Sequence, residues 1–446
     1  METLNPKNNS LVSSFFLFTL FMMFFLTYNE GIINNALARS SDELFLFFSV
    51  IIIALSIFTH LLKLKLPKYL FVFLIYLFYQ IINYYQSPFP LQLHFVLIQS
   101  LINIKVFLVA TAAIYLYSSS RFNNLLIQKT FKIFVFLFLF GMIASFVLGP
   151  TWSAWFNTPA VYRYGFLRPV GWFGSVAHNA YFLTLTFVTL FLLYSKKPNI
   201  SLSTLTKKFF LFSIIDFLLA FPLTVRKGLM INLPFGYIIL EKYQKYQKVL
   251  FVTVSTLFAI LFLYFIKDLE IFQDTLDNFK NFTHDQHTYI RGLMVFYGYG
   301  IFLEFFPFGS GAATFGTVLS QFNTLAVYEY VNLDMDRIYY NKGQLDGVYD
   351  SGLFSMLAEN GFIGIFLMFL LIYYFFKLNK AKLDTYNYMI FKIITWFALL
   401  LSITEPVWQN GLFTVMYTIN LLLIYTRNNQ YRIAGKWITV AHTELS

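Results

Sequence analysis

The chain has 446 residues, of which 58% are hydrophobic and only 12% are charged, and its formal net charge is +11. A soluble domain is about 45–50% apolar and about 25% charged, so this composition excludes an ordinary soluble domain and predicts a polytopic membrane protein. The basic residues stand in short clusters between apolar runs, which argues against a nucleic-acid partner. The chain has no cysteine, which excludes disulfides, thiolate metal ligands and cysteine nucleophiles.

Apolar runs of about 20 residues, long enough to cross a bilayer, divide the chain. About twelve membrane-spanning helices are expected, over residues 11–28, 44–62, 69–85, 95–117, 131–149, 175–195, 208–223, 228–241, 249–266, 353–376, 387–404 and 410–426. We therefore predict an all-α polytopic membrane protein that forms one membrane domain over residues 1–446. The first run lacks a small-x-small cleavage pattern and is expected to remain as a helix.

Two regions of this pattern carry unusual charge. The seventh and eighth runs are short and meet at Arg226, which predicts a hairpin that barely crosses the membrane. The fourth run contains Lys105, whose charge should face the bundle interior or reach toward one end. Asp216 in the seventh run is either a proton-relay residue, as in a transporter, or the buried partner of Lys105.

Basic residues fill every second loop, as the positive-inside rule requires of cytoplasmic loops. These clusters are Lys63/Lys65/Lys68, Arg121/Lys129/Lys132, Lys196/Lys197/Lys207/Lys208, Lys242/Lys245/Lys248, Lys377/Lys380/Lys382 and Arg427/Arg432/Lys436. The intervening loops carry most of the carboxylates. Both termini are therefore predicted in the cytoplasm, and the loop over residues 267–352, between the ninth and tenth spans, is predicted on the outer side.

The 267–352 loop is the one long polar interval in the sequence, and loops longer than about 15 residues usually carry function. Its run 289–306 is apolar and aromatic, which predicts a helix that lies at the membrane interface or dips partway in. That run is interrupted by Gly292, Gly298, Gly300 and Glu304. The following run, Pro307 to Gly316, has three spaced glycines but no Walker lysine, so it predicts a closely packed turn rather than a nucleotide loop.

Arginines on the outer side are informative because the positive-inside rule disfavours them there. Those beyond Arg39 are Arg163, Arg168, Arg226, Arg291 and Arg337. A guanidinium grips phosphate through paired N–H donors, so this group suits a pyrophosphate at headgroup level. The alternative is that these side chains snorkel at the interface or pair with carboxylates of the loop.

Two carboxylates flank the start of the tenth span. Asp350 is either the N-cap of that helix or a general base held ionised near arginines. Glu359 stands further along the same helix, where a carboxylate needs an arginine or backbone donors as partners. For Glu359 we favour a structural role over a chemical one.

Polar residues at two other places are weaker candidates. His178 and Asn179 open the sixth span and either hydrogen-bond a substrate or serve a structural role. His284 and His287, with Asp285 between them, could suggest a metal, but their spacing lacks a third nearby ligand of clear geometry, so no metal site is expected.

Four stretches, in this order, resemble the O-antigen ligase and Wzy-type polysaccharide polymerase superfamily of bacterial inner membranes. They are RPVGWFGSVAHNAYF (Arg168 to Phe182), LTVRKGLM (Leu223 to Met230), YIRGLMVFYGYGIFLEFFPFGSGAATFG (Tyr289 to Gly316) and DSGLFSMLAENGFIGIF (Asp350 to Phe366). Val225 stands where the family commonly has serine. Ligases typically have histidine where this chain has Asp350, and polymerases often have aspartate, so the resemblance favours a polymerase.

The resemblance implies a fold of C-type glycosyltransferase character and an inverting, metal-independent transfer without a cofactor. The substrates implied are glycans linked to undecaprenyl pyrophosphate, whose polyprenyl tails lie in hydrophobic membrane grooves of the bilayer-embedded protein. Arg226 and Arg291 would hold the donor pyrophosphate and Asp350 would act as the base, with Arg168 as a further phosphate ligand. His178, Asn179 and Glu359 are substrate-binding candidates. A chain-length regulator and a glycan flippase are implied partners.

The resemblance thus predicts a glycosyltransferase of the bacterial inner membrane that polymerises repeat units of O-antigen or capsular polysaccharide on the outer face. One alternative is an O-antigen ligase, which would transfer the glycan to lipid A core. A second, from a different class, is a lipid-glycan flippase or transporter, in which inverted repeats and charge at the membrane midplane are expected.

Overall fold

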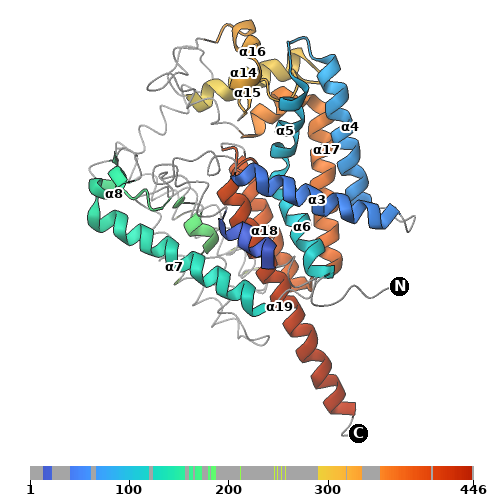
Figure 1. Cartoon of the computed structure of the whole chain (residues 1–446), viewed down its shortest axis with the longest axis vertical. Helices are drawn as coiled ribbons and strands as arrows, with labels where there is room; N and C mark the ends of the chain where they lie inside the picture. The colour runs from blue at the N-terminus through green and yellow to red at the C-terminus, as the bar shows by residue number, and fades with distance from the viewer. Residues whose placement is uncertain are drawn as a thin grey trace.

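The structure is a computed structural model of the chain. Apart from a few isolated positions, it describes residues 14–22, 41–61, 67–119, 124–155, 160–163, 166–172, 179–180, 182–186, 290–317, 319–333, 352–402 and 405–443. Within these ranges almost every regular element is a helix, which agrees with the all-α prediction (Figure 1).

The helices are the 14–22 segment, α3 (Ser41–Leu61), α4 (Lys68–Gln86), α5 (Leu93–Asn103), α6 (Lys105–Ser119), α7 (Asn124–Leu148), α8 (Pro150–Trp155), α14 (Ile290–Glu304), α15 (Ser320–Asn323), α16 (Ala326–Tyr330), α17 (Gly352–Lys382), α18 (Thr385–Ser402) and α19 (Gly411–Thr443). One antiparallel hairpin of two strands, β1 (Val161–Arg163) and β2 (Phe166–Arg168), pairs Val161 with Arg168. The sequence patterns did not predict this hairpin.

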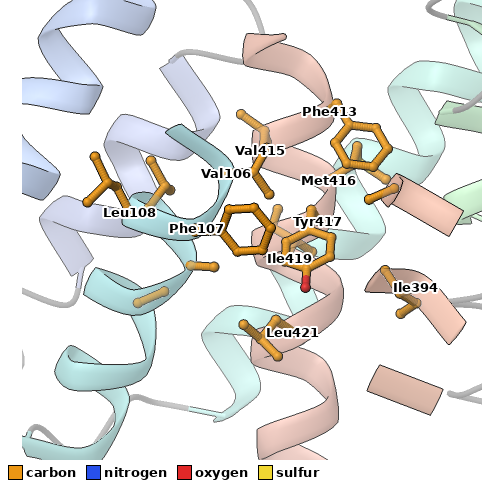
Figure 2. Close-up of a cluster of buried hydrophobic side chains, with 14 of the residues drawn as sticks. Val106, Phe107, Leu108, Ile394, Phe413, Val415, Met416, Tyr417, Ile419 and Leu421 are labelled. Atoms are coloured by element: carbon orange, nitrogen blue, oxygen red, sulfur yellow. The ribbon is translucent and has the colours of Figure 1, made fainter. Parts of the chain in front are cut away.

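The core is built around α6, which packs against α3 and α19. Each residue of α6 from Val106 to Ala110 exposes at most 2% of its surface. Figure 2 shows Phe107 of α6 beside Tyr417 and Ile419 of α19. Lys105, at the first position of α6, is also buried, which agrees with the first of its two predicted placements, in the interior of the bundle.

In the part of the chain that the structure describes, two helices, α7 and α17, are long and apolar enough to cross a membrane, and α5 with α6 would add a third if this bent pair forms one span. Large apolar side chains are exposed along one side of such helices; on α17 they are Phe362, Phe366, Phe369 and Tyr373. Exposed apolar faces of this length are compatible with a membrane protein, in which lipid covers them.

The helix bounds confirm several of the predicted apolar helices and correct others. α3, α4, α17 and α18 match the runs 44–62, 69–85, 353–376 and 387–404 closely. The run 95–117 is not one straight helix, because α5 and α6 meet at a 64° bend around Ile104. α7 starts before residue 131, and α19 continues past residue 426 to Thr443. The runs 208–223, 228–241 and 249–266 lie outside the described residues, apart from isolated positions.

α17 is broken at Gly361, whose backbone has φ 58° and ψ −166°. A left-handed residue interrupts the helical hydrogen bonds, and glycine adopts it without the penalty that a Cβ brings. A Cβ on Gly361 would also overlap the backbone of Phe308 and Gly309. The loop 307–317 therefore crosses α17 in direct backbone contact at this break.

We expect Gly361→Ala to destabilise the protein. The substitution adds about 1–2 kcal/mol of left-handed strain and an overlap that typically costs about 1–3 kcal/mol. Gly300→Ala is the matched control, because it is also a helical glycine but a Cβ there would meet nothing within 4 Å. Thermal unfolding of the detergent-solubilised protein should show a lower Tm for the first variant and an equal or higher Tm for the second. Equal Tm values for both variants would contradict the close crossing.

Candidate functional site

Glu359 is fully buried and lies just before the break in α17 at Gly361. Its Oε1 accepts hydrogen bonds from the backbone N–H groups of Thr314, at 2.8 Å, and Phe315, at 3.1 Å, and also from the Thr317 hydroxyl. All these donors belong to the loop 307–317. One carboxylate oxygen thus holds the loop in place over the helix break.

The loop in turn caps the backbone of the broken helix. The N–H of Ser310 donates to the Ala358 carbonyl at 2.8 Å, and the N–H of Gly311 donates to the Glu359 carbonyl at 3.0 Å. A break in a helix leaves such carbonyls without partners, and in an apolar environment each must find one inside the protein. The loop supplies those partners.

α4 also donates hydrogen bonds to residues at the break. The Tyr79 hydroxyl lies within hydrogen-bond distance of the Phe308 and Asn360 carbonyls, at 2.9 and 2.7 Å. The Asn83 amide donates to the Glu359 carbonyl at 3.0 Å, and the Gln80 amide donates to the Asn360 side chain at 2.8 Å. We call these contacts between α4, the loop 307–317 and residues 358–361 the polar knot.

A second polar cluster marks the bend between α5 and α6. The Gln99 and Gln409 amides both donate to Oδ1 of Asn103, at 2.8 and 3.0 Å. The N–H of Leu319 donates to the Gln99 side chain at 3.0 Å. This cluster ties the bend to the start of α19 and to the segment after the loop 307–317.

A groove of about 600 Å³ opens beside the polar knot, between α14, α16 and the start of α17. Its lining residues are Val295, Phe296, Tyr297, Tyr299, Gly300, Ile301, Glu304, Tyr330, Val331, Asn332 and Phe354. Most are aromatic or aliphatic, and Glu304, Tyr330 and Asn332 form one polar wall. Apolar linings with a few polar groups are typical of small-molecule sites.

Two glycines of α14 shape this groove. Gly298 is buried against the start of α17, and a Cβ there would lie 3.0 Å from the Phe354 carbonyl oxygen. Gly300 is exposed, and a Cβ there would meet nothing within 4 Å. The first glycine thus lets the two helices approach, and the second leaves space within the groove.

The polar wall is built around the carboxylate of Glu304. The Tyr330 hydroxyl donates to its Oε1, and this hydrogen bond raises the pKa of Tyr330 above its ordinary value. Asn332, two residues on, has a left-handed backbone with φ 52°, a conformation that asparagine tolerates better than most residues. The wall thus presents a carboxylate acceptor, a phenol and an amide to the groove.

α14 and the first part of α17 run parallel. Gly298 lies against Phe354, and eight residues further along both segments the rings of Phe306 and Phe362 are 5.8 Å apart. The N–H of Ile363 then donates to the Pro307 carbonyl at 3.3 Å. The N-terminal ends of the two helices therefore lie at the same end of the pair.

The predicted catalytic residues are described only in part. Arg291 lies in the first turn of α14, where its backbone is described and its side chain is not. Asp350, Arg226 and His178 lie outside the described residues. No group of three or more histidines, aspartates and glutamates that could hold a metal occurs in the part of the chain that the structure describes.

The remaining predicted residues lie away from the groove lining. Arg168 is on strand β2 and is half-buried. Asn179 is fully buried, and its amide donates to the Pro169 carbonyl at 3.3 Å. Gly171 packs on the same side chain, because a Cβ there would lie 2.6 Å from its Oδ1. These contacts fit a structural role for Asn179 beneath the 169–172 turn.

Sequence reasoning missed the groove as a site. Its polar wall joins α14 to residues at the end of α16 and just beyond it, and no local pattern connects Glu304 to Tyr330 or Asn332. A signal was present, because Gly298, Gly300 and Glu304 interrupt an otherwise apolar run. A groove with a polar wall can form where small residues and one carboxylate interrupt an apolar helix.

No protein-family model matches the chain, and no curated protein matches its sequence. The resemblance carried by the four sequence stretches therefore remains an interpretation of the sequence.

Glu359→Gln should keep the polar knot, because the amide oxygen still accepts from Thr314, Phe315 and Thr317. Glu359→Ala should destabilise the protein by several kcal/mol, because each buried donor left unpaired costs about 1–3 kcal/mol. Thermal unfolding and limited proteolysis within the loop 307–317 would measure both effects. If Glu359→Gln were folded normally but lost the protein's activity, the carboxylate would have a chemical role beyond holding the loop.

Proposed function

We propose that this protein polymerises oligosaccharide repeat units carried on a polyprenyl pyrophosphate, as an inverting, metal-independent glycosyltransferase on the outer face of a bacterial inner membrane. The product would be an O-antigen or capsular polysaccharide. The proposal rests on the sequence resemblance, and one structural observation supports it.

That observation is the parallel packing of α14 on the first part of α17. Arg291 is in the first turn of α14, and Asp350 stands two residues before Gly352 in the sequence. Arg291 therefore lies at the end of the helix pair where α17 begins, and in the sequence Asp350 comes just before that beginning. The polar knot fixes the position of this pair and so supports a preorganised site.

The chemistry would depend on these two groups. The Asp350 carboxylate would take the proton of an acceptor hydroxyl as that oxygen bonds to the anomeric carbon of the donor sugar. The bond from that carbon to the pyrophosphate oxygen would break on the opposite face, which inverts the configuration. The leaving polyprenyl pyrophosphate would carry away the bonding electron pair, and the Arg291 guanidinium would stabilise the charge that develops on it. Arg226 would serve the same leaving group.

A transporter is the second candidate, and the two helix breaks favour it. Transporters bind substrates where interrupted helices meet, near the membrane midplane. In this protein the helical path is interrupted at the bend at Ile104 and at the break at Gly361. The loop 307–317 and α4 occupy the second break, however, and their donors bind its carbonyls. Because the break is filled, we favour the interpretation that it is part of a rigid scaffold and not a transport site.

Arg291→Ala should reduce polymer formation by about 10²–10³-fold, the usual effect of removing one donor that stabilises developing charge. Arg291→Lys should restore little, because an ammonium lacks paired donors. We expect Arg226→Ala to behave as Arg291→Ala does, and Arg39→Ala is the control, because Arg39 is an arginine on the predicted outer side that is outside the proposed phosphate-binding group. Gel analysis of the surface glycan should show single repeats in cells with the impaired variants. Wild-type chain lengths in the Arg291→Ala cells would contradict the phosphate role.

Asp350→Asn separates catalysis from helix capping. Asparagine caps a helix about as well as aspartate does but cannot accept the proton. We expect normal protein levels and a loss of about 10²–10⁴-fold in polymerisation of the purified lipid-linked repeat. Unchanged activity would mean that Asp350 only caps α17. Adding lipid A core as an acceptor distinguishes a ligase, since only a ligase would glycosylate it.

A further inference from the structure

We propose that the groove between α14, α16 and the start of α17 binds a sugar residue of the glycan, and that this sugar carries no negative charge. The inference rests on the proposed function for the identity of the glycan. It assigns a separate binding subsite, which is distinct from the pyrophosphate and base positions at Arg291 and Asp350.

The groove lining has the chemistry that a sugar ring requires. A pyranose presents an apolar C–H face and a rim of hydroxyl groups. The rings of Phe296, Tyr299 and Phe354 offer flat apolar surface on which the C–H face can pack. The Glu304 carboxylate accepts hydrogen bonds from hydroxyls, and the Asn332 amide both donates and accepts them.

The charge of the groove lining disfavours binding of the pyrophosphate part of the substrate in the groove. Among the lining residues that the structure describes there is no lysine, arginine or histidine, and the one charged group is the carboxylate of Glu304. A pyrophosphate or an acidic sugar would be repelled by this carboxylate without a compensating cation. A sugar that is neutral or carries an amine would not be repelled.

The same carboxylate argues against a lipid tail. Glu304 and Tyr330 are exposed and hydrogen-bonded to each other at the wall of the groove. An alkyl chain in contact with this pair would remove their water and return no hydrogen bond, which is unfavourable. The exposed aromatic stripe of α17, at Phe362, Phe366 and Phe369, has no such charged group among its members and suits lipid better.

The groove also extends in the direction that a glycan would take. It starts at Val295, one turn after Arg291, and continues to Glu304 on the same helix. At about 1.5 Å per residue, Glu304 lies about 20 Å from Arg291 along the helix axis. If the phosphate is held at the start of α14, the sugars attached to it would therefore lie along the groove.

Gly300 provides the test, because its exposed position leaves the groove open and no neighbouring atom would clash with a new Cβ. Gly300→Leu fills the groove and improves helix propensity, so the variant should fold. Leu303→Phe is the matched control, since it adds bulk at an exposed position of α14 that does not line the groove. Glu304→Gln tests the polar wall with little change in shape.

The probe is a radiolabelled oligosaccharide released by mild acid from the host's surface polysaccharide, and its equilibrium binding to the full-length protein in nanodiscs is measured. We expect wild type and Leu303→Phe to bind alike, and Gly300→Leu and Glu304→Gln to bind at least tenfold more weakly at an unchanged Tm. Inorganic pyrophosphate and phospholipid should not displace the probe. Undiminished binding by Gly300→Leu, no binding by wild type, or displacement by pyrophosphate or lipid would overturn the inference.

This experiment is independent of the proposed function. The probe is obtained whether or not this protein makes the polymer. If deletion of the gene leaves chain lengths unchanged while the groove variants still lose binding, the polymerase proposal fails and the sugar subsite stands. If deletion yields single repeats while Gly300→Leu binds and polymerises normally, the subsite fails and the polymerase proposal stands.

Discussion

The rest of the structure depends on one buried carboxylate and the backbone that it holds. Glu359 accepts two backbone N–H groups and one hydroxyl from the loop 307–317, and that loop returns donors to the carbonyls at the break in α17. In an apolar interior an unpaired peptide group is expensive, so the loop and the break satisfy each other. This reciprocal bonding sets where α14 ends relative to α17, and hence the shape of the groove between them.

The two ends of α14 carry side chains of opposite charge. Its first turn carries Arg291, and its last turn carries Glu304. In the proposed substrate the carrier is anionic and the glycan carries no negative charge, so it would align on this helix with the carrier at Arg291 and the glycan at Glu304. Because α14 packs against α17, that alignment would be maintained during the transfer. Holding two reactants in the correct geometry in this way lowers the barrier of a bimolecular reaction.

Hydrophobic runs were sufficient to locate α3, α4, α17 and α18, because burial or lipid contact requires apolar length in each. They did not reveal the bend at Ile104 or the break at Gly361, since a run's average hydropathy is unaffected by one altered backbone angle. Glu359 was predicted to need either an arginine or backbone donors, and the structure shows backbone donors. Its donors come from residues about 45 positions away, however, which local patterns do not specify.

The groove illustrates the same limit. Gly298, Gly300 and Glu304 are visible in the sequence as interruptions, and the interfacial helix that contains them was predicted. Their meaning depends on Tyr330, Asn332 and Phe354, which tertiary packing brings to α14. The roles of Arg226, Asp350 and His178 remain predictions, because they lie outside the described residues.

The polar knot also constrains the order in which the protein is assembled. Tyr79 contacts carbonyls 229 and 281 residues further along the chain, so α4 cannot make these contacts until α14 and the first part of α17 have been synthesised. Contacts with such large sequence separation form late, because the entropy of closing the intervening chain must first be overcome. During synthesis, the polar side chains of α4 are therefore without their final partners for a long interval. A nascent chain arrested before Gly361 would expose these groups and become a target for membrane quality control.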